Sequence, residues 1–271
     1  MEWRNLYRGV LMGITDLIPG ISGGTIAVML GIYERLLTAI SGFFSSNWRR
    51  QIGFLIPLAL GMGSALLIFS RLIKYLLEHH YEPTQFFFIG LVIGVLPLLL
   101  KQSDARRNFR PIHVIMLIIS GALVASLAFF NADKTGLPID DRSALTLLGL
   151  FFSGWLASMA MLLPGISGSF VLLMLGVYPT AIHALSSLDF LLIAVIGAGV
   201  MIGFVVSSKG IKLLLSRYAN LTYALMIGMI MGSVAVMYPG LAGDTATILI
   251  CVLTFVLGLA TTLVFGLRKK A

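Results

Sequence analysis

The stretch Leu17-Ile-Pro-Gly-Ile-Ser-Gly-Gly24 returns, nearly unchanged, as Leu162-Leu-Pro-Gly-Ile-Ser-Gly-Ser169. In both places a Pro-Gly break followed by Ser-Gly interrupts a run of apolar residues. Such a break exposes backbone, which is tolerated at membrane depth only where protein buries it or a polar cavity meets it. Two breaks in corresponding places are typical of a transporter built from two halves, and they indicate its binding site.

The composition is that of a chain embedded in a lipid bilayer. Of the 271 residues, 58% are hydrophobic and only 11% are charged. Several apolar runs exceed the roughly 20 residues that a helix needs to cross a bilayer. The formal net charge of +8 does not indicate nucleic-acid binding, because the basic residues lie in short loops between apolar runs. The sequence therefore predicts an all-α polytopic membrane protein with no nucleic-acid partner.

The second half of the chain repeats the first beyond the two motifs. When the motifs are superimposed, Pro19 meets Pro164 and Tyr33 meets Tyr178. After a short deletion, the pairs in register are Arg71 with Lys209, Lys74 with Lys212, Gly90 with Gly228 and Gly94 with Gly232. The repeat covers most of the chain, so chance is a poor explanation for it.

Each repeat is predicted to hold one re-entrant helical hairpin, with arms too short to span a bilayer, and three transmembrane helices. Repeat one covers 1–130 and repeat two covers 144–271 of a single transmembrane domain, 1–271. The expected elements are a hairpin at 6–40 with spans at 52–77, 84–100 and 112–130, then a hairpin at 150–185 with spans at 188–215, 221–238 and 246–267. Because a hairpin returns to its own side and three spans change sides, the second repeat must be inverted relative to the first.

The charges along the chain favour the same inverted topology. With a cytoplasmic N-terminus, the inner loops are rich in Lys and Arg and the outer loops in Asp and Glu, as the positive-inside rule requires. The inner bases are Arg49, Arg50, Lys101, Arg106, Arg107, Arg110, Lys209, Lys212, Arg217, Arg268, Lys269 and Lys270. The outer acids are Glu78, Glu82, Asp133, Asp140, Asp141, Asp189 and Asp244, with Lys134 and Arg142 among them. Both termini are therefore predicted to be cytoplasmic.

The residues after each Pro-Gly break are suited to binding an anion. Serine is a good N-cap residue, glycine lets a ligand approach the backbone, and the N-terminus of a helix attracts phosphate. The alternative is that Gly and Ser only permit close helix packing. We call the segments after the two Pro-Gly breaks the hairpin tips. Because both tips keep their hydroxyl groups, the anion site is favoured over simple helix packing. The predicted phosphate-binding residues of the tips are Ser22, Gly23, Gly24, Thr25, Ser167, Gly168 and Ser169.

Two basic pairs stand near the ends of predicted spans. Arg71 and Lys74 share one helix face, and Lys209 and Lys212 repeat them in the second half. One interpretation is that they only extend toward the membrane interface. However, Arg71 and Lys74 fall on the predicted outer side, against the charge bias. A basic pair on each side of the membrane favours capture of an anionic headgroup from either leaflet. The arginine can form two parallel hydrogen bonds to phosphate oxygens, and the lysines act as point charges.

Two acidic residues at predicted membrane depth, Asp16 and Glu34, break the symmetry of the repeat. Their counterparts are Met161 and Pro179. An ionisable group inside a membrane is a candidate for a proton or cation relay, so both are candidates for coupling to a proton or sodium gradient. Alternatively, Glu34 pairs with Arg35 or lies near the cytoplasmic surface, and Asp16 forms a hydrogen bond across the helix break.

Other kinds of chemistry find no support in the sequence. There is no nucleotide-binding Gly-x-x-x-x-Gly-Lys signature, so ATP is not expected to drive the protein. Cys251 is the only cysteine, the four histidines lack zinc-like spacing, and no catalytic Ser/His/Asp set is apparent. Tyr33 and Tyr178 are interpreted as packing or interface aromatics. The sequence thus predicts no cofactor, no metal and no enzyme.

The string Asp16-Leu-Ile-Pro-Gly-Ile-Ser-Gly-Gly-Thr25, continued by Gly31-Ile-Tyr-Glu-Arg35, resembles the polyprenyl-phosphate transporter family, formerly a domain of unknown function. Leu163-Pro-Gly-Ile-Ser-Gly-Ser169 with Gly176-Val-Tyr178 is similar to the other half-motif of that family. The resemblance spans essentially the whole chain. The family positions that it assigns are Asp16, Pro19, Gly20, Ser22, Gly23, Gly24, Thr25, Gly31, Tyr33, Glu34, Pro164, Gly165, Ser167, Gly168, Ser169 and Tyr178. Ser169-Phe170 stands in the second tip where the first has Gly24-Thr25, so the two tips are not strictly equivalent.

The resemblance implies a multi-pass protein of the cytoplasmic (inner) membrane that binds a polyprenyl-phosphate lipid. Its implied function is to move undecaprenyl phosphate from the outer to the inner leaflet, which recycles the lipid carrier for cell-envelope synthesis. One alternative is a membrane enzyme similar to undecaprenyl-diphosphate phosphatases, but Gly23 and Gly168 stand where that family has an arginine, and its paired-glutamate helix is missing. Another alternative is a transporter of a small soluble anion.

Overall fold

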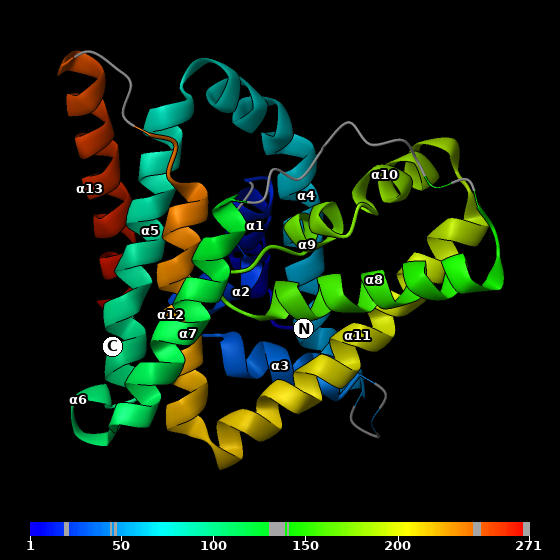
Figure 1. The fold of residues 1–271 in the computed structure, drawn as a ribbon, viewed down its shortest axis with the longest axis horizontal. Helices are drawn as coiled ribbons and strands as arrows, with labels where there is room; N and C mark the ends of the chain where they lie inside the picture. Colours follow the sequence, from blue (N-terminus) through cyan, green and yellow to red (C-terminus); the bar gives the residue numbers. More distant parts are fainter. Residues whose placement is uncertain are drawn as a thin grey trace.

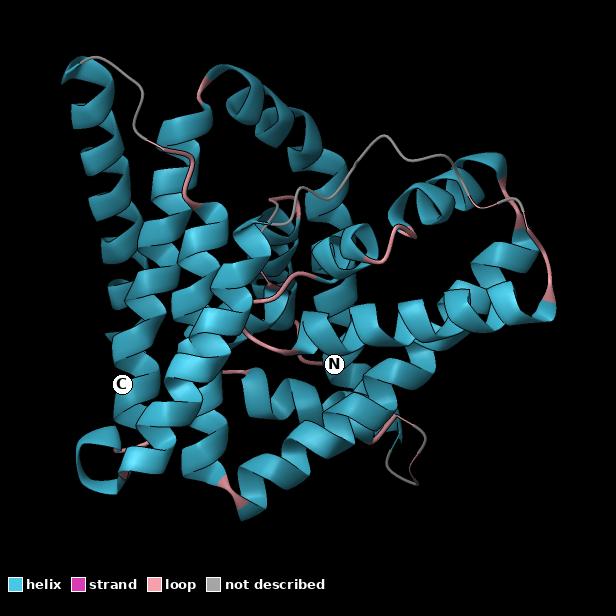
Figure 2. Cartoon of the chain, viewed as in Figure 1, coloured by secondary structure: helices cyan, strands magenta, loops and turns pink. Residues whose placement is uncertain are grey.

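Apolar runs form helices here because a helix satisfies its own backbone hydrogen bonds, which lipid cannot do. The computed structural model describes residues 1–18, 22–43, 45, 48–129, 139, 141–240 and 245–267. Within these ranges every regular element is a helix (Figure 2). Residues named above that lie outside the described ranges are Pro19, Gly20, Asp133, Lys134, Asp140, Asp244, Arg268, Lys269 and Lys270.

The first predicted hairpin consists of three short helices. These are α1 (Asn5–Asp16), α2 (Gly23–Met29) and α3 (Tyr33–Ser41). Ser22 is the N-cap of α2, where its Oγ accepts a hydrogen bond from the Gly24 N–H at 3.1 Å. Gly31, with φ of +67°, turns the chain from α2 into α3, a conformation that glycine adopts without steric cost.

The second predicted hairpin differs from the first in the length of its first arm. It comprises α8 (Ala144–Leu162), α9 (Gly168–Met174) and α10 (Tyr178–Ser187), and the last two are bent by 110° relative to each other. α8 has 19 residues and is apolar enough to cross a membrane. The expectation that every arm is too short to span is therefore wrong for α8. The helix extends to Ala144 because Ser143 caps it, accepting from the Thr146 N–H at 3.3 Å.

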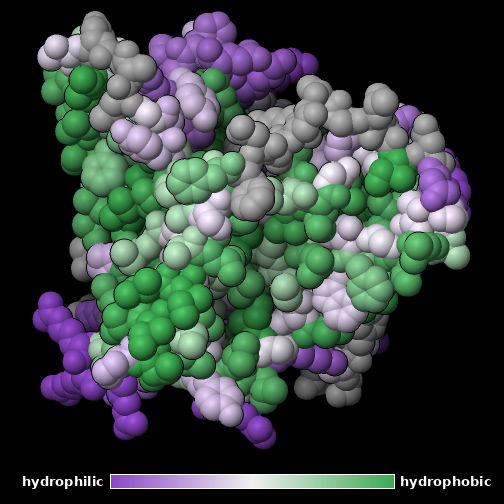
Figure 3. Space-filling model, viewed as in Figure 1, coloured by the Kyte–Doolittle hydropathy of each residue, from purple (hydrophilic) through white to green (hydrophobic). Residues whose placement is uncertain are grey.

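Seven described helices are long and apolar enough to cross a membrane, so the chain is a multi-pass membrane protein. Besides α8, they are α4 (Trp48–His79), α5 (Tyr81–Gln102), α7 (Pro111–Ser126, extended by the 3-10 turn Leu127–Phe129), α11 (Phe190–Arg217), α12 (Ala219–Met237) and α13 (Thr245–Leu267). The short α6 (Ala105–Asn108) lies between α5 and α7. In Figure 3 a broad hydrophobic surface separates hydrophilic groups at opposite ends of the molecule, which is the pattern of a membrane-embedded surface.

Eight helices, α1 and the seven membrane-spanning candidates, pack in pairs that correspond between the two halves. α1 packs along α4 as α8 packs along α11, and α5 packs along α13 as α12 packs along α7 (Figure 1). Small residues permit this close approach. A Cβ on Gly61 would lie 2.1 Å from Leu6 O, and one on Gly199 would lie 2.0 Å from Phe151 O. These two contacts occupy equivalent positions of the sequence repeat, while the orientation of the halves in the membrane stays a prediction.

The short helices break this correspondence. α3 packs against α11, whereas α10 makes at most marginal contact with α4. All seven residues of α2 are buried, and the helix packs against α5, α8 and α13. In α9 only Gly168 is buried. The molecule is therefore closed at the end where α3 lies and more open on the side of α9 and α10.

Candidate functional site

The two hairpin tips lie in direct contact. α8 ends at Leu162, and the last carbonyl groups of a helix have no partner within it. Ser22 Oγ lies 3.1 Å from both Met161 O and Leu163 O, so its hydroxyl can donate to either. The Tyr33 hydroxyl donates to Leu162 O at 2.9 Å. The first tip therefore satisfies the C-terminal end of α8.

A hydrogen bond in the opposite direction completes this contact. The Gly165 N–H donates to Thr25 Oγ1 at 3.0 Å. A Cβ on Gly24 would lie 2.9 Å from Leu162 O, so only glycine allows the chains to approach so closely. Ser22 and Thr25 are only 2% and 1% exposed. The sequence predicted that both hydroxyl groups face a phosphate, but in this conformation they bind the other tip.

Beside this contact lies a cavity of about 250 Å3, which we call the tip cavity. It is lined by Asp16, Ser22 and Gly23 of the first tip, by Ser167, Gly168 and Ser169 of the second, and by Ala157, Met161, Leu172 and Val200. Six of the predicted site residues thus come together here, from segments about 145 positions apart in the sequence. Four apolar side chains complete the lining and surround the polar groups.

The hydroxyl groups of the second tip are placed differently from those of the first. Ser167 Oγ and Ser169 Oγ lie 2.8 Å apart, and Ser167 makes no side-chain cap bond to α9. A hydroxyl donates one hydrogen bond and accepts up to two, and it rotates to suit its partner. Both groups can therefore turn toward an oxygen that enters the tip cavity, which Ser22 and Thr25 cannot do while the tips are joined.

Among the described residues, Asp16 is the only acidic one that lines the tip cavity. Its carboxylate accepts a hydrogen bond from the backbone N–H of Gly23. A Cβ on Gly23 would meet the two carboxylate oxygens at 3.0 and 3.3 Å. The hydrogen bond across the helix break, which was the structural interpretation of Asp16, is thus present, and the same side chain borders the cavity.

A second, apolar cavity of about 410 Å3 adjoins the tip cavity, and we call it the side chamber. The two share Asp16, Gly23 and Met161 as lining residues. The remaining lining residues are Met12, Gly24, Leu36, Ile40, Phe43, Leu55, Leu58, Ala59, Met62, Leu162, Met201, Phe204 and Val205. Of the lining residues that the structure describes, Asp16 is therefore the only charged one around the side chamber, and it stands where the chamber meets the tip cavity.

Glu34 lies apart from the tips. It borders a small cavity of about 90 Å3, where its Oε1 lies 3.3 Å from the Tyr223 hydroxyl and 3.5 Å from Gln102 Nε2. Arg35 is turned away from it and donates to Gln51 Oε1 at 2.6 Å. The alternative in which Glu34 pairs with Arg35 is thus wrong.

The basic pairs are not brought to either cavity. Arg71, Lys74, Lys209 and Lys212 are all exposed on the surfaces of α4 and α11. Lys74 Nζ lies 3.7 Å from Glu78 Oε1, one turn further along the helix. In this conformation these four residues can meet a headgroup at the membrane surface but not one held between the tips.

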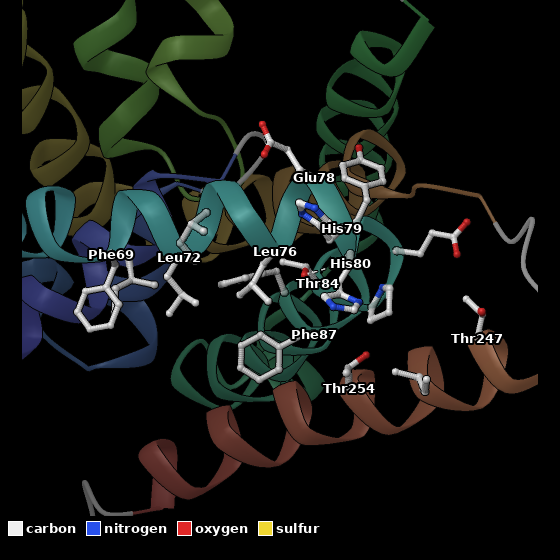
Figure 4. A pocket seen from close by; sticks show the side chains of 17 residues that line it. Phe69, Leu72, Leu76, Glu78, His79, His80, Thr84, Phe87, Thr247 and Thr254 are labelled. Carbon is white, nitrogen blue, oxygen red and sulfur yellow. Dashed lines mark hydrogen bonds between the residues drawn. The ribbon is translucent and has the colours of Figure 1, made fainter.

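A further cavity, of about 930 Å3, was not foreseen from the sequence. It lies between the end of α4, the start of α5 and α13, and Figure 4 shows His80, Thr84, Phe87 and Thr254 around it. Arg71 and Lys74 do not line it, although they belong to the same helix turns. Its walls come from α4 and α5, which are consecutive in the sequence, and from α13 and Ile14 of α1, which are distant from them, so no local pattern could reveal the whole cavity.

Tyr33 was also underestimated, because it was interpreted as a packing aromatic. The position of Tyr33 inside the first motif could have indicated a role at the tips. Its hydrogen-bond acceptor could not be found from the sequence, because Leu162 O lies 129 residues away. Tyr178 occupies the equivalent position in the second half and is only partly buried. The two tyrosines therefore differ in role because of tertiary contacts.

Comparison with known proteins identifies the family of the chain. Residues 12–249 match the VCA0040-like family, described as undecaprenyl phosphate translocase-like. A polyprenyl-phosphate transporter of Staphylococcus aureus (strain NCTC 8325 / PS 47) is 40% identical over 272 residues, which cover 98% of this chain and 96% of the relative. One of Vibrio cholerae serotype O1 (strain ATCC 39315 / El Tor Inaba N16961) is 31% identical over 253 residues, 88% of this chain and 79% of the relative. No solved structure matches the chain significantly. The resemblance predicted from the motifs is thereby confirmed, and the chain belongs to the undecaprenyl phosphate translocase-like family.

Proposed function

We propose that this protein moves undecaprenyl phosphate from the outer to the inner leaflet of the cytoplasmic membrane, with the phosphate passing through the tip cavity. The observation that carries the proposal is the cavity itself, in which hydroxyl groups from both halves meet between apolar walls. The names of the two relatives support a polyprenyl phosphate as the substrate. Release of the carrier on the cytoplasmic side would return it to cell-envelope synthesis.

The physical problem for such a protein is the charge of the phosphate. A charged group is very costly in an apolar medium unless polar groups replace its water. Ser167 and Ser169 can donate hydrogen bonds to phosphate oxygens, and Gly168 between them lines the same cavity. The long apolar tail gains nothing from leaving lipid. Transport therefore requires only the headgroup to be shielded, and no covalent bond is broken.

Asp16 suits a role in ion coupling. A carboxylate and a phosphate in the same small cavity repel each other when both are ionised. If Asp16 takes up a proton, the repulsion disappears and the carboxyl group donates a hydrogen bond to the phosphate. Binding of the phosphate is therefore expected to draw a proton to Asp16 from the outer side, and release inside would return it to the cytoplasm. A sodium ion bound at the carboxylate is the alternative coupling ion.

The asymmetry of the short helices suggests how access alternates. α3 closes against α11, while its counterpart α10 stands away from α4. In transporters with inverted repeats, exchange of the two halves' conformations moves the opening from one side to the other. We expect α10 to close on α4 when α3 leaves α11. Arg71 and Lys74 would collect headgroups at the outer surface, and Lys209 and Lys212 would receive them inside.

The proposal is tested with purified protein in vesicles, by following labelled undecaprenyl phosphate from one leaflet to the other. The double variant Ser167→Ala/Ser169→Ala should slow transport by about tenfold or more, because a hydrogen bond to a charged group contributes about 1.5–3 kcal/mol. Ser186→Ala, on the exposed surface of α10, is the matched control. Transport at the wild-type rate in the double variant would exclude the tip cavity from the mechanism.

The same vesicles separate the two competing functions. Release of inorganic phosphate from undecaprenyl diphosphate by the wild-type protein would identify an enzyme instead of a transporter. Inhibition of lipid movement by glycerol phosphate, together with uptake of that ester, would identify a transporter of small soluble anions. We expect lipid movement with neither phosphate release nor uptake of the ester.

A further inference from the structure

The side chamber is suited to an apolar chain attached to a charged group. Its lining is apolar except at Asp16, which stands where the chamber opens into the tip cavity. A ligand that places its charge between the tips therefore has an apolar space directly beside its point of attachment. A soluble anion would leave this space unused.

The chamber also has a route to the lipid. Its walls come from α4 and α11, which make at most marginal contact with each other, and α3 bridges them at one end. Met201 lines the chamber and is 50% exposed, and Met161 is 36% exposed. In a membrane-embedded helix an exposed apolar side chain faces lipid tails. The gap between α4 and α11 is thus a lateral opening from the bilayer to the headgroup site.

The size of the chamber limits how much chain it can hold. An engineered apolar cavity of about 150 Å3 binds benzene, which has six carbon atoms. A cavity of about 410 Å3 on this scale holds about three five-carbon units. Four methionines, Met12, Met62, Met161 and Met201, contribute to the lining, and their flexible side chains adapt to an irregular apolar ligand.

We propose that the side chamber binds the isoprene units of the substrate tail nearest the phosphate, and that the rest of the tail leaves through the gap between α4 and α11. This inference rests on the proposed function and identifies which part of the lipid gives affinity. The phosphate places the substrate between the tips, whereas the first isoprene units distinguish it from short phosphate esters. The distal tail stays in lipid and contributes little to recognition.

Ala59→Trp tests this inference by filling the chamber from the α4 side. The purified protein in detergent is titrated with geranylgeranyl phosphate and with dimethylallyl phosphate, which share a headgroup and differ in tail length. We expect the affinity for geranylgeranyl phosphate to fall by about tenfold or more, since each buried methylene contributes to affinity. Affinity for dimethylallyl phosphate should change by less than about twofold, because its single unit lies next to the tips. Leu60→Trp is the matched control, since Leu60 is 53% exposed and does not line the chamber.

A second pair of variants guards against misfolding. Met201→Trp fills the chamber from α11, and Ile202→Trp is its control on the neighbouring exposed position. Equal loss of both ligands in the chamber variants, or wild-type affinity for geranylgeranyl phosphate in both of them, overturns the assignment of the chamber to the tail. Failure of the wild-type protein to bind either phosphate would instead contradict the proposed function. The two failures are thus distinguishable.

Discussion

Tyr33 joins the two tips through one hydroxyl group, and Tyr33→Phe removes that group without changing the ring. The variant loses the hydrogen bond of 2.9 Å to Leu162 O, at the C-terminal end of α8. Tyr33 is only 7% exposed, so water cannot readily replace the donor. A buried carbonyl left without a partner costs about 1–3 kcal/mol. For a chain of this size we expect the midpoint of thermal unfolding to fall by roughly 2–10 °C.

The measurement is thermal unfolding of the purified variants in the same detergent, followed by tryptophan fluorescence. Tyr178→Phe is the matched control, because Tyr178 has the equivalent position in the second half and its hydroxyl makes no hydrogen bond among the described residues. The control should unfold within about 1 °C of the wild type, as substitutions away from such contacts do. Equal midpoints for the two variants, whether both lowered or both unchanged, would refute the role assigned to Tyr33.

Three further predictions concern the tips and one helix cap. Asp16→Asn should make lipid movement independent of an imposed proton or sodium gradient, and gradient dependence that survives in vesicles would make this carboxylate purely structural. In a Cys251→Ser background, Ser169→Cys should react with a membrane-impermeant maleimide added from the outer side, whereas Ala27→Cys, fully buried in α2, should stay unlabelled. Labelling of Ala27→Cys without labelling of Ser169→Cys would contradict the closed end described above. Asp189 caps α11, and its hydrogen bond from the Leu192 N–H holds the pKa of the carboxyl below its usual value. The cap therefore stabilises the fold above the unfolded pKa of about 3.9 and is lost as the pH falls through the folded pKa, so Asp189→Ala should lower the unfolding midpoint at pH 7, and this effect should become smaller as the pH is lowered below about 3.9.

The helices could be predicted from the sequence because apolar runs and helix breaks act only on the residues next to them. Apolar runs must be helical in lipid, and a Pro-Gly pair at 164–165 ends α8 wherever the rest of the chain lies. The start of α8 was missed because the capping contact of Ser143 lies outside the apolar run that was read as the arm. The sequence shows the glycines that pack α1 on α4 and α8 on α11 as repeated small residues, but it does not show which backbone atoms they approach.

The site could be predicted only in part. The structure brings Asp16, Ser22 and Ser167 around one cavity, because duplicated helix breaks at membrane depth need each other or a ligand to cover their backbone, while phosphate binding by these residues stays a prediction. The basic pair Arg71 and Lys74 was placed on one helix face, as helical spacing requires, but the spacing says nothing about whether that face meets a cavity. In the structure it does not.

The sequence by itself determined that this is a helical membrane protein with two interrupted segments, because composition and helix breaks act over a few residues. Only the tertiary structure decided which hydroxyl groups bind the other tip and which ones face the tip cavity. Ser22 and Ser167 stand in nearly identical local sequences, yet Ser22 binds the carbonyl groups of α8 and Ser167 faces the tip cavity. The physical reason is that a hydroxyl hydrogen bonds whichever acceptor the fold brings within reach, and that acceptor lies 139 residues away.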